Sequence, residues 1–257
     1  ALARPSAIML DDDFRFGFIG SGFNCTCPMH MKKINAVLGE EISPSSLMER
    51  ALSGGKNKYR DAWMKINGEA LLTHAKKIRK AVDDIDPKKR IGFCSCISVW
   101  DQDGVDSVTL AKTLAGNTKP YMRLIGAPYW AVNKSWGNRL QNVIEIERIE
   151  RAWCGEGIEI YAEGDAYPRP RLHCAANYVE GFDTALRASG EIDGILRICM
   201  DYVSNVGYEN GYLNKYLKNK PIYRDIEKHF TNKKHTGIRI YATQRKVETM
   251  QNPNVLR

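Results

Sequence analysis

Short apolar segments alternate with helical patterns along the chain and predict a parallel α/β architecture. Five of these segments are bounded by turn residues and indicate strands: Ala7–Leu10, Ile91–Ser98, Met122–Tyr129, Ile158–Ala162 and Ile195–Met200. The last four recur at intervals of about thirty to forty residues, which is the length of one strand–helix unit in a parallel sheet. They are continuous apolar runs rather than polar alternations, as expected for strands that are buried on both faces.

Amphipathic helices are predicted between the strands, because apolar residues recur there at the spacing of one helix face. Stripes of this kind run through residues 63–78, 105–114, 140–147 and 175–186, and two further short helices are predicted at 212–217 and 222–230. Gly116 and Gly190 follow two of the stripes and are typical of residues that end a helix.

The pattern divides the chain into a barrel portion, residues 1–230, and a short end, residues 231–257. A long loop insertion, rich in Gly, Ser and Cys, occupies residues 14–60. The short end begins a following domain or forms a tail. Its alternation of apolar and polar residues at 237–241 predicts one further strand.

Each predicted strand is followed by a carboxylate or a large aromatic side chain. In parallel α/β folds the carboxyl ends of the strands lie at one rim, where functional groups gather. One acidic strand end would mean little, since Asp is a common turn and cap residue. The candidate site residues are Asp11, Asp12, Asp13, Arg15, Trp100, Asp101, Tyr129, Trp130, Glu163, Asp165, Arg169 and Asp201.

A rim of this composition suits the cleavage of glycosidic bonds. That reaction needs two carboxyl groups that flank the bond, and aromatic faces suit the apolar faces of sugar rings. The best pair is Glu163 with Asp12 or Asp13. A solvated loop remains an alternative interpretation of the Asp run, and a salt bridge to Arg169 or Arg171 remains one for Glu163. A hard metal held by several carboxylates is the competing chemistry.

A second cluster of candidate ligands lies in the insertion. Cys25, Cys27 and His30 offer three ligands suited to zinc within six residues. A structural zinc site needs four ligands, so the fourth must come from elsewhere. Free thiols beside a surface histidine are the alternative interpretation. No other cofactor is expected, because the sequence holds no Gly-rich phosphate loop.

Charge, apolar content and cysteine usage indicate which partners and which cellular compartment to expect. The 257 residues carry a formal net charge of +8, but Lys and Arg are spread along the chain, so a basic groove for nucleic acid is not expected. No run approaches the ~18 to 20 apolar residues that span a bilayer, so no membrane association is expected. Seven scattered cysteines, an odd number, favour a reducing compartment, and we expect a cytoplasmic location.

The residues from Leu10 to Arg15, followed by Cys25-x-Cys27-x-x-His30, resemble part of a known enzyme family. Over residues 7–205 the chain is similar to the (β/α)8-barrel glycoside hydrolases related to the cysteine-cluster bacterial β-galactosidases. In that family the acid/base Glu ends the fourth strand, a Cys cluster follows, and the nucleophile Glu ends the seventh. The resemblance implies that the five strands are strands four to eight of a TIM-type barrel, with Glu163 as nucleophile and Asp12 or Asp13 as acid/base.

The chain departs from the family pattern in two places. An Asp stands where the family has its acid/base Glu, which sets the proton donor back by the length of a methylene, and His30 replaces the last Cys of the cluster. The chain also opens without an initiator Met. We therefore expect a missing N-terminal portion of the barrel, or self-association that covers an open sheet edge.

Three functions remain as hypotheses. The first is a retaining glycoside hydrolase that cleaves a carbohydrate with Glu163 and Asp12 or Asp13. The second is a carbohydrate-binding protein on the same scaffold, catalytically weak because of the Asp substitution. The third is a metal-dependent lyase or hydrolase that uses the carboxylate rim. A carboxyl separation of ~5 to 5.5 Å supports the retaining enzyme, and ~6.5 to 9.5 Å supports an inverting one.

Overall fold

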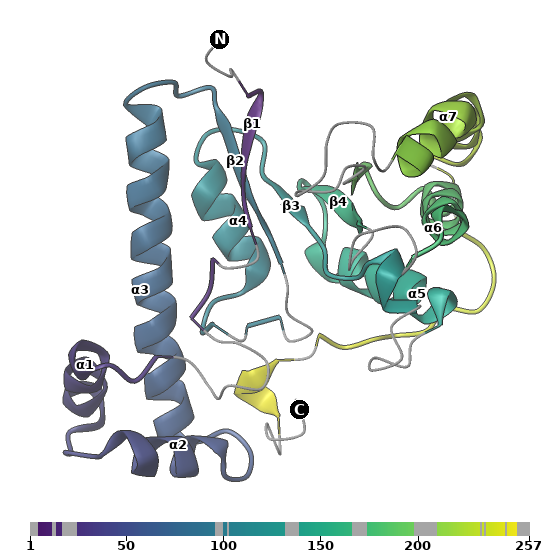
Figure 1. Cartoon of the computed structure of the whole chain (residues 1–257). Coiled ribbons are helices and arrows are strands. Elements are labelled where there is room, and N and C mark those ends of the chain that lie inside the picture. The colour runs from purple at the N-terminus through teal and green to yellow at the C-terminus, as the bar shows by residue number, and fades with distance from the viewer. Residues whose placement is uncertain are drawn as a thin grey trace. The chain divides into compact units, whose positions relative to one another are not determined.

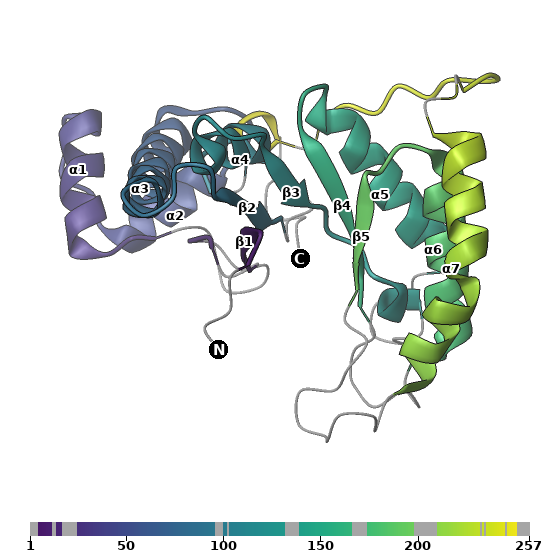
Figure 2. The same cartoon turned by 90° about the horizontal axis from the view of Figure 1, so that it is seen from above.

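The chain folds into an α/β structure made of two compact units. A computed structural model describes residues 5–11, 14–16, 25–95, 100–101, 103–131, 139–165, 174–197, 210–231, 233, 235–244 and 246–250. Unit 1 comprises residues 1–121 and 243–257, and unit 2 comprises residues 122–242. The strands hydrogen-bond in chain order, β1-β2-β3-β4-β5, so the predicted strand order is confirmed (Figures 1 and 2).

In unit 1, strand β1 (Ala7–Leu10) pairs in parallel with β2 (Arg90–Cys94). The register places Ile8 beside Ile91 and Leu10 beside Phe93. Ile91 and Phe93 are buried. Parallel neighbours need a long connection, and helices supply most of this one.

Those helices lie partly in the segment expected as a loop insertion. It contains α1 (Pro28–Leu38), α2 (Pro44–Leu52) and the start of α3 (Lys58–Asp83). Local signals explain their starts, because Pro opens α1 and α2, and the side chain of Asn57 caps α3. Apolar side chains from all three helices form one core, and α1 and α2 gather at one end of α3 (Figure 1).

Helix α4 (Ser107–Ala115) packs against α3 in unit 1. Its N-terminus is capped by the carboxylate of Asp106, which accepts the backbone N–H groups of Val108 and Thr109. It ends before Gly116, where φ is +57°, as the sequence predicts.

Unit 2 is built on β3 (Tyr121–Arg123), whose first residue lies at the division, and on the parallel pair β4 (Glu159–Gly164) and β5 (Gly194–Arg197). Helices α5 (Leu140–Cys154) and α6 (Ala176–Ser189) cover this pair with an apolar core that includes Val143, Ala162 and Phe182. Helix α7 (Asn210–Phe230) lies beside α6 in both views (Figures 1 and 2).

The first strand has the predicted bounds, Ala7–Leu10, whereas the third and fourth strands differ from those predicted. The third strand ends at Arg123 rather than near Tyr129, because Gly126 has a φ of +134° and Pro128 begins a short 3-10 helix, η1 (Pro128–Ala131). For the second, the structure describes the strand Arg90–Cys94 followed by Ser95, and residues 96–98 lie outside the described residues. For the fifth, the structure describes Gly194–Arg197, and residues 198–200 lie outside the described residues.

Two predictions for the C-terminal part were wrong. The two short helices are one helix, α7, which continues through Pro221. Tyr212 and Tyr223 are buried on either side of that proline, so packing offsets the hydrogen bond that proline removes. The strand expected at 237–241 has no regular secondary structure. A short 3-10 helix, η2 (Val247–Thr249), follows it.

Candidate functional site

The carboxyl end of β4 places one predicted site residue in a built environment within unit 2. Glu163 lies at the end of this strand, and only 8% of its surface is exposed. The Tyr129 hydroxyl, from η1, lies 3.4 Å from Glu163 Oε1. The Arg123 guanidinium, from the end of β3, lies 3.6 Å from the same oxygen. Both groups stabilise a carboxylate and limit its orientation.

Two buried carboxyl groups of α5 extend this environment, Glu147 by contact with Glu163 and Glu150 through its charge on Glu147, and the sequence interpretation missed both. Glu147 Oε1 accepts the backbone N–H of Glu163 at 3.4 Å, and Glu150 Oε2 accepts that of Ile125 at 3.1 Å. We call Arg123, Tyr129, Glu147, Glu150 and Glu163 the Glu163 site.

Burial controls the protonation of these two acids. It raises the pKa of Glu147 well above its usual value, and the neighbouring Glu150 carboxyl raises it further. Burial also raises the pKa of Glu150 well above its usual value. The fold therefore favours the neutral, protonated form of both side chains.

A signal for these acids was present in the helix pattern. Val143, Ile144, Glu147 and Glu150 share the buried face of α5, so two acids stand where the stripe calls for apolar residues. Gly126 supports the arrangement, since a Cβ there would lie 3.3 Å from Glu147 Cγ. An acid in the core stripe of a predicted helix is thus a usable indication of a polar site.

The protonation states of Tyr129 and Cys174 determine whether each side chain can donate a hydrogen bond or act as a nucleophile. Burial first, and then the charge of Glu163, raise the pKa of Tyr129, so its hydroxyl keeps its proton and donates it. Burial raises the pKa of the Cys174 thiol to about 11. A neutral thiol is a poor nucleophile, so Glu163 is the better candidate for covalent chemistry.

The other predicted residues of this rim divide into two groups. Trp130, in η1, and Asp165, directly after β4, are half-buried residues of unit 2. Asp12, Asp13, Arg169 and Asp201 lie outside the described residues. The pairing of Glu163 with Asp12 or Asp13 therefore stays a prediction.

Candidates on the first two strand ends lie in unit 1. Asp11 is exposed and Arg15 is half-buried. Trp100 is fully buried and offers no surface to a ligand. Asp101 is also buried, and its carboxylate accepts the backbone N–H groups of Val247 at 2.7 Å and Glu248 at 3.4 Å. Asp101 therefore has a structural partner in the C-terminal segment.

Cys25, Cys27 and His30 are brought together at the start of α1. One ligand atom from each lies within 4.8 Å of the others, so the three could hold a metal ion. Cys27 is the N-cap residue of α1, and His30 follows in its first turn. The backbone carbonyl of Cys25 accepts the Trp63 indole N–H at 3.1 Å, which ties the loop to α3.

The chemistry of this donor set fits a soft or borderline metal. Two thiols and an imidazole are ligands that zinc prefers. His30 is 8% exposed, and its Nδ1 has no hydrogen-bond partner within the part of the chain that the structure describes. The pKa of Cys27 is lowered, chiefly because the backbone N–H of His30 bonds to its sulfur.

Comparison with known proteins finds no relative of this chain. Neither a protein family, nor a curated protein, nor a solved structure matches the chain. Among the helices that the structure describes, none combines the length and apolar character of a membrane span.

Proposed function

We propose that this protein is a glycoside hydrolase that acts on a carbohydrate through a retaining mechanism, with Glu163 as nucleophile. The observation that carries the proposal is the buried carboxyl of Glu163 at a strand end, contacted on one oxygen by Tyr129 and Arg123. A nucleophilic carboxylate needs a fixed orientation and a desolvated setting. The chemistry of this site meets both needs.

The proposed reaction has two steps. The Glu163 carboxylate attacks the anomeric carbon while the leaving oxygen takes a proton from Asp12 or Asp13, which gives a glycosyl ester and a free alcohol. Water then hydrolyses the ester, with the same Asp as base. Arg123 and Tyr129 would hold the carboxylate in place before the attack and stabilise it when it is released.

The competing metal chemistry at the carboxylate rim has less support. Among the described residues, the cluster that could hold a metal is Cys25, Cys27 and His30, and it contains no carboxylate. Glu147 and Glu150 are also held in their neutral forms by burial. Neutral carboxyls are weak ligands for a hard cation.

Covalent trapping tests the proposal. A panel of 2-deoxy-2-fluoroglycosides with good leaving groups should add one glycosyl mass to the intact chain, because the fluorine slows hydrolysis of the ester. Peptide mapping should place the label on Glu163. Glu163→Gln should take up no label, while the matched variant Glu156→Gln, at an exposed position before β4, should be labelled like wild type.

The outcomes separate the hypotheses. Label on another residue would reject Glu163 as the nucleophile. Sugar binding by calorimetry with no label and no turnover of aryl glycosides would favour the carbohydrate-binding protein. Failure to bind or cleave any member of the panel would reject both.

We further propose that Cys25, Cys27 and His30 bind zinc with a structural role. Zinc would fix the start of α1 to the loop before it, and the fourth ligand would come from outside this cluster. The odd number of cysteines and their scatter along the sequence support the proposed cytoplasmic, reducing location.

Metal analysis tests the zinc proposal. Protein purified without chelator should contain about one zinc per chain, and Cys27→Ser should lose most of it. The matched variant Cys154→Ser, at a buried cysteine of α5, should keep its zinc. Cobalt replacement should give thiolate-to-cobalt charge-transfer absorption that Cys27→Ser weakens. Equal zinc content in both variants would contradict the proposal.

A further inference from the structure

Glu147 and Glu163 are two buried carboxyl groups that are connected by a hydrogen bond in unit 2. Glu147 is fully buried, and Glu163 is 8% exposed. Oε1 of Glu147 accepts the backbone N–H of Glu163 at 3.4 Å. Each carboxyl disfavours the ionisation of the other, because their charges interact in a place that excludes most of the solvent. We therefore expect one of the two acids to keep its proton.

The surroundings of the two acids differ, and they place the negative charge on Glu163. The Arg123 guanidinium lies 3.6 Å from Glu163 Oε1, and the Tyr129 hydroxyl lies 3.4 Å from the same atom. Within the described residues, Oε2 of Glu147 has no hydrogen-bond partner. A fully buried carboxyl without a cation beside it costs far less free energy as a neutral acid than as an anion.

The other groups that face Glu147 are consistent with a neutral acid. Burial raises the pKa of Glu147 well above its usual value, and the carboxyls of Glu150 and Glu163 raise it further. The backbone N–H of Glu163 and the charge of Arg123 lower the pKa of Glu147. Burial is the largest of these effects, so Glu147 stays protonated while Arg123 stabilises the anion of Glu163.

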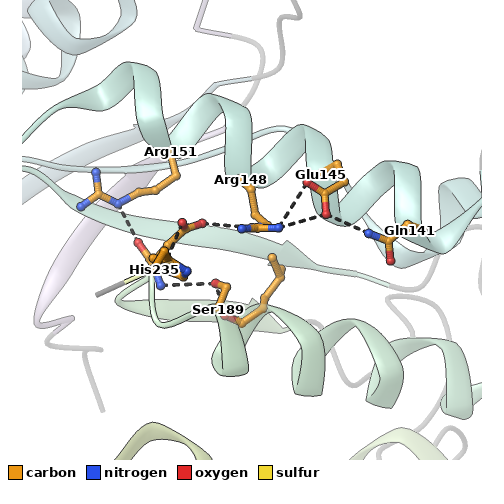
Figure 3. Close-up of polar contacts among 8 residues, drawn as sticks. Gln141, Glu145, Arg148, Arg151, Ser189 and His235 are labelled. Carbon is orange, nitrogen blue, oxygen red and sulfur yellow. Dashed lines mark hydrogen bonds and ion pairs between the residues drawn. The ribbon is translucent and has the colours of Figure 1, made fainter. Parts of the chain in front are cut away.

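Two arginines of α5 hold this helix in place within unit 2 (Figure 3). The Arg148 guanidinium donates to Glu191 Oε2 at 3.2 Å and to Glu145 Oε1 at 3.1 Å. The Arg151 Nε–H donates to the backbone carbonyl of Glu191 at 2.6 Å. Glu191 lies between α6 and β5, so α5 is fixed to the connection that leads into the strand beside β4. A fixed helix limits the positions that Glu147 can take.

We propose that Glu147 is a positioning residue for Glu163: as a neutral acid it leaves the negative charge of the pair on Glu163, and its Oε1 holds the backbone at the end of β4. A nucleophilic carboxylate must be both ionised and fixed in orientation. Glu147 is fully buried, so it acts through Glu163 and touches no substrate. The inference rests on the proposed role of Glu163 as nucleophile, but its first test needs no substrate.

Infrared spectroscopy of the full chain at neutral pH tests whether Glu147 is neutral. Protonated carboxyls absorb apart from carboxylates, so wild type should show an acid carbonyl band. Glu147→Gln should lose part of this band, because it removes one protonated carboxyl. The matched variant Glu156→Gln, at an exposed position, should keep the whole band. A wild type without the band, or an unchanged band in Glu147→Gln, would overturn the inference whether or not the protein cleaves a glycoside.

The rate at which Glu163 takes up a 2-deoxy-2-fluoroglycoside tests the positioning role. Glu147→Gln should be labelled at close to the wild-type rate, because its neutral amide oxygen still accepts the Glu163 N–H. Glu147→Met has a similar length but no acceptor, and it should be labelled about tenfold more slowly. The glycoside concentration that gives half the maximal rate should be the same in all three proteins, because Glu147 does not touch the sugar.

The outcomes separate this inference from the proposed activity. Circular dichroism checks that each variant is folded, and Glu147→Leu is a second apolar variant if Glu147→Met is not. Wild-type labelling rates in a folded apolar variant would overturn the positioning role alone. A wild type that takes up no label would reject the proposed activity and, with it, a positioning role in catalysis.

Discussion

Glu150 shows at the scale of a residue how burial is coupled to pH. Its carboxyl is 2% exposed and accepts the backbone N–H of Ile125, and burial raises its pKa. Above the ordinary pKa of Glu, about 4.3, the unfolded chain has released this proton while the folded chain still holds it. The folded state then binds more protons, so the free energy of unfolding falls as pH rises.

We predict that Glu150→Gln removes part of this pH dependence. The amide oxygen can still accept from Ile125, but the side chain no longer ionises. The free energy of unfolding of the variant minus that of wild type should therefore be larger at pH 8 than at pH 5. Urea unfolding at both pH values measures this, and Glu156→Gln, an exposed control, should show no such change. Parallel pH profiles for wild type and Glu150→Gln would refute the account.

The contact between α3 and α4 shows how elements depend on small residues. A Cβ on Gly68, in α3, would lie 2.2 Å from the carbonyl oxygen of Gly104, in the loop before α4. The nearest atoms, the carbonyl oxygen and carbon of Gly104, belong to the backbone, so the helix and the loop would have to separate. Gly39, which ends α1 with a φ of +70°, has nothing within 4 Å of such a Cβ.

We predict that Gly68→Ala destabilises the protein more than Gly39→Ala does. The first should cost about 2 to 3 kcal/mol because it forces backbone apart. The second should cost about 1 kcal/mol, because only the left-handed conformation is disfavoured. Thermal or urea unfolding of the two variants provides the comparison, and the reverse order would show that α3 and α4 are packed differently.

At the scale of the whole molecule, residues 247–250 are hydrogen-bonded within unit 1 to two buried side chains far away in the sequence, Arg60 and Asp101. The fully buried Arg60 guanidinium donates to the carbonyls of Val247 at 3.1 Å and Met250 at 2.7 Å, and also to Ala51 and Gly54. Asp101 accepts from the same segment. One cation and one anion therefore bind the backbone of η2, largely independently of its side chains.

We predict that Arg60→Met releases this segment. Four carbonyls lose a charged donor, so the free energy of unfolding should fall by about 2 kcal/mol or more. Hydrogen exchange at the amides of Val247 and Glu248 should speed up by more than about tenfold, since their hydrogen bonds to Asp101 would open more often. Arg50→Met, at an exposed position on α2, is the control. Unchanged exchange in Arg60→Met would show that Asp101 holds the segment alone.

Particular residues show how far the sequence could predict the structure. Gly116 and Gly190 end helices where expected, because both adopt a positive φ, which glycine tolerates without strain, and Gly190 forms a left-handed cap. Residues 237–241 form no strand, although the sequence predicted one, because a strand needs a pairing partner that the local pattern does not supply. The candidate site was predicted in part. Glu163 follows from its place at the end of an apolar run, whereas Glu147 is separated from it by sixteen residues of chain.

The sequence by itself therefore determined the order of the five strands, the presence of α3, α4, α5 and α6 between them, and the carboxylate at the end of β4. These depend on periodicity and on cap residues, which act over a few residues. Only the tertiary structure decided that Arg123, Tyr129 and Glu147 contact Glu163, that Glu150 lies beside Glu147, and that Trp100 is buried. Those outcomes depend on how the helices and strands pack. Packing brings residues that are distant in the sequence into contact, and burial then shifts the pKa of their side chains.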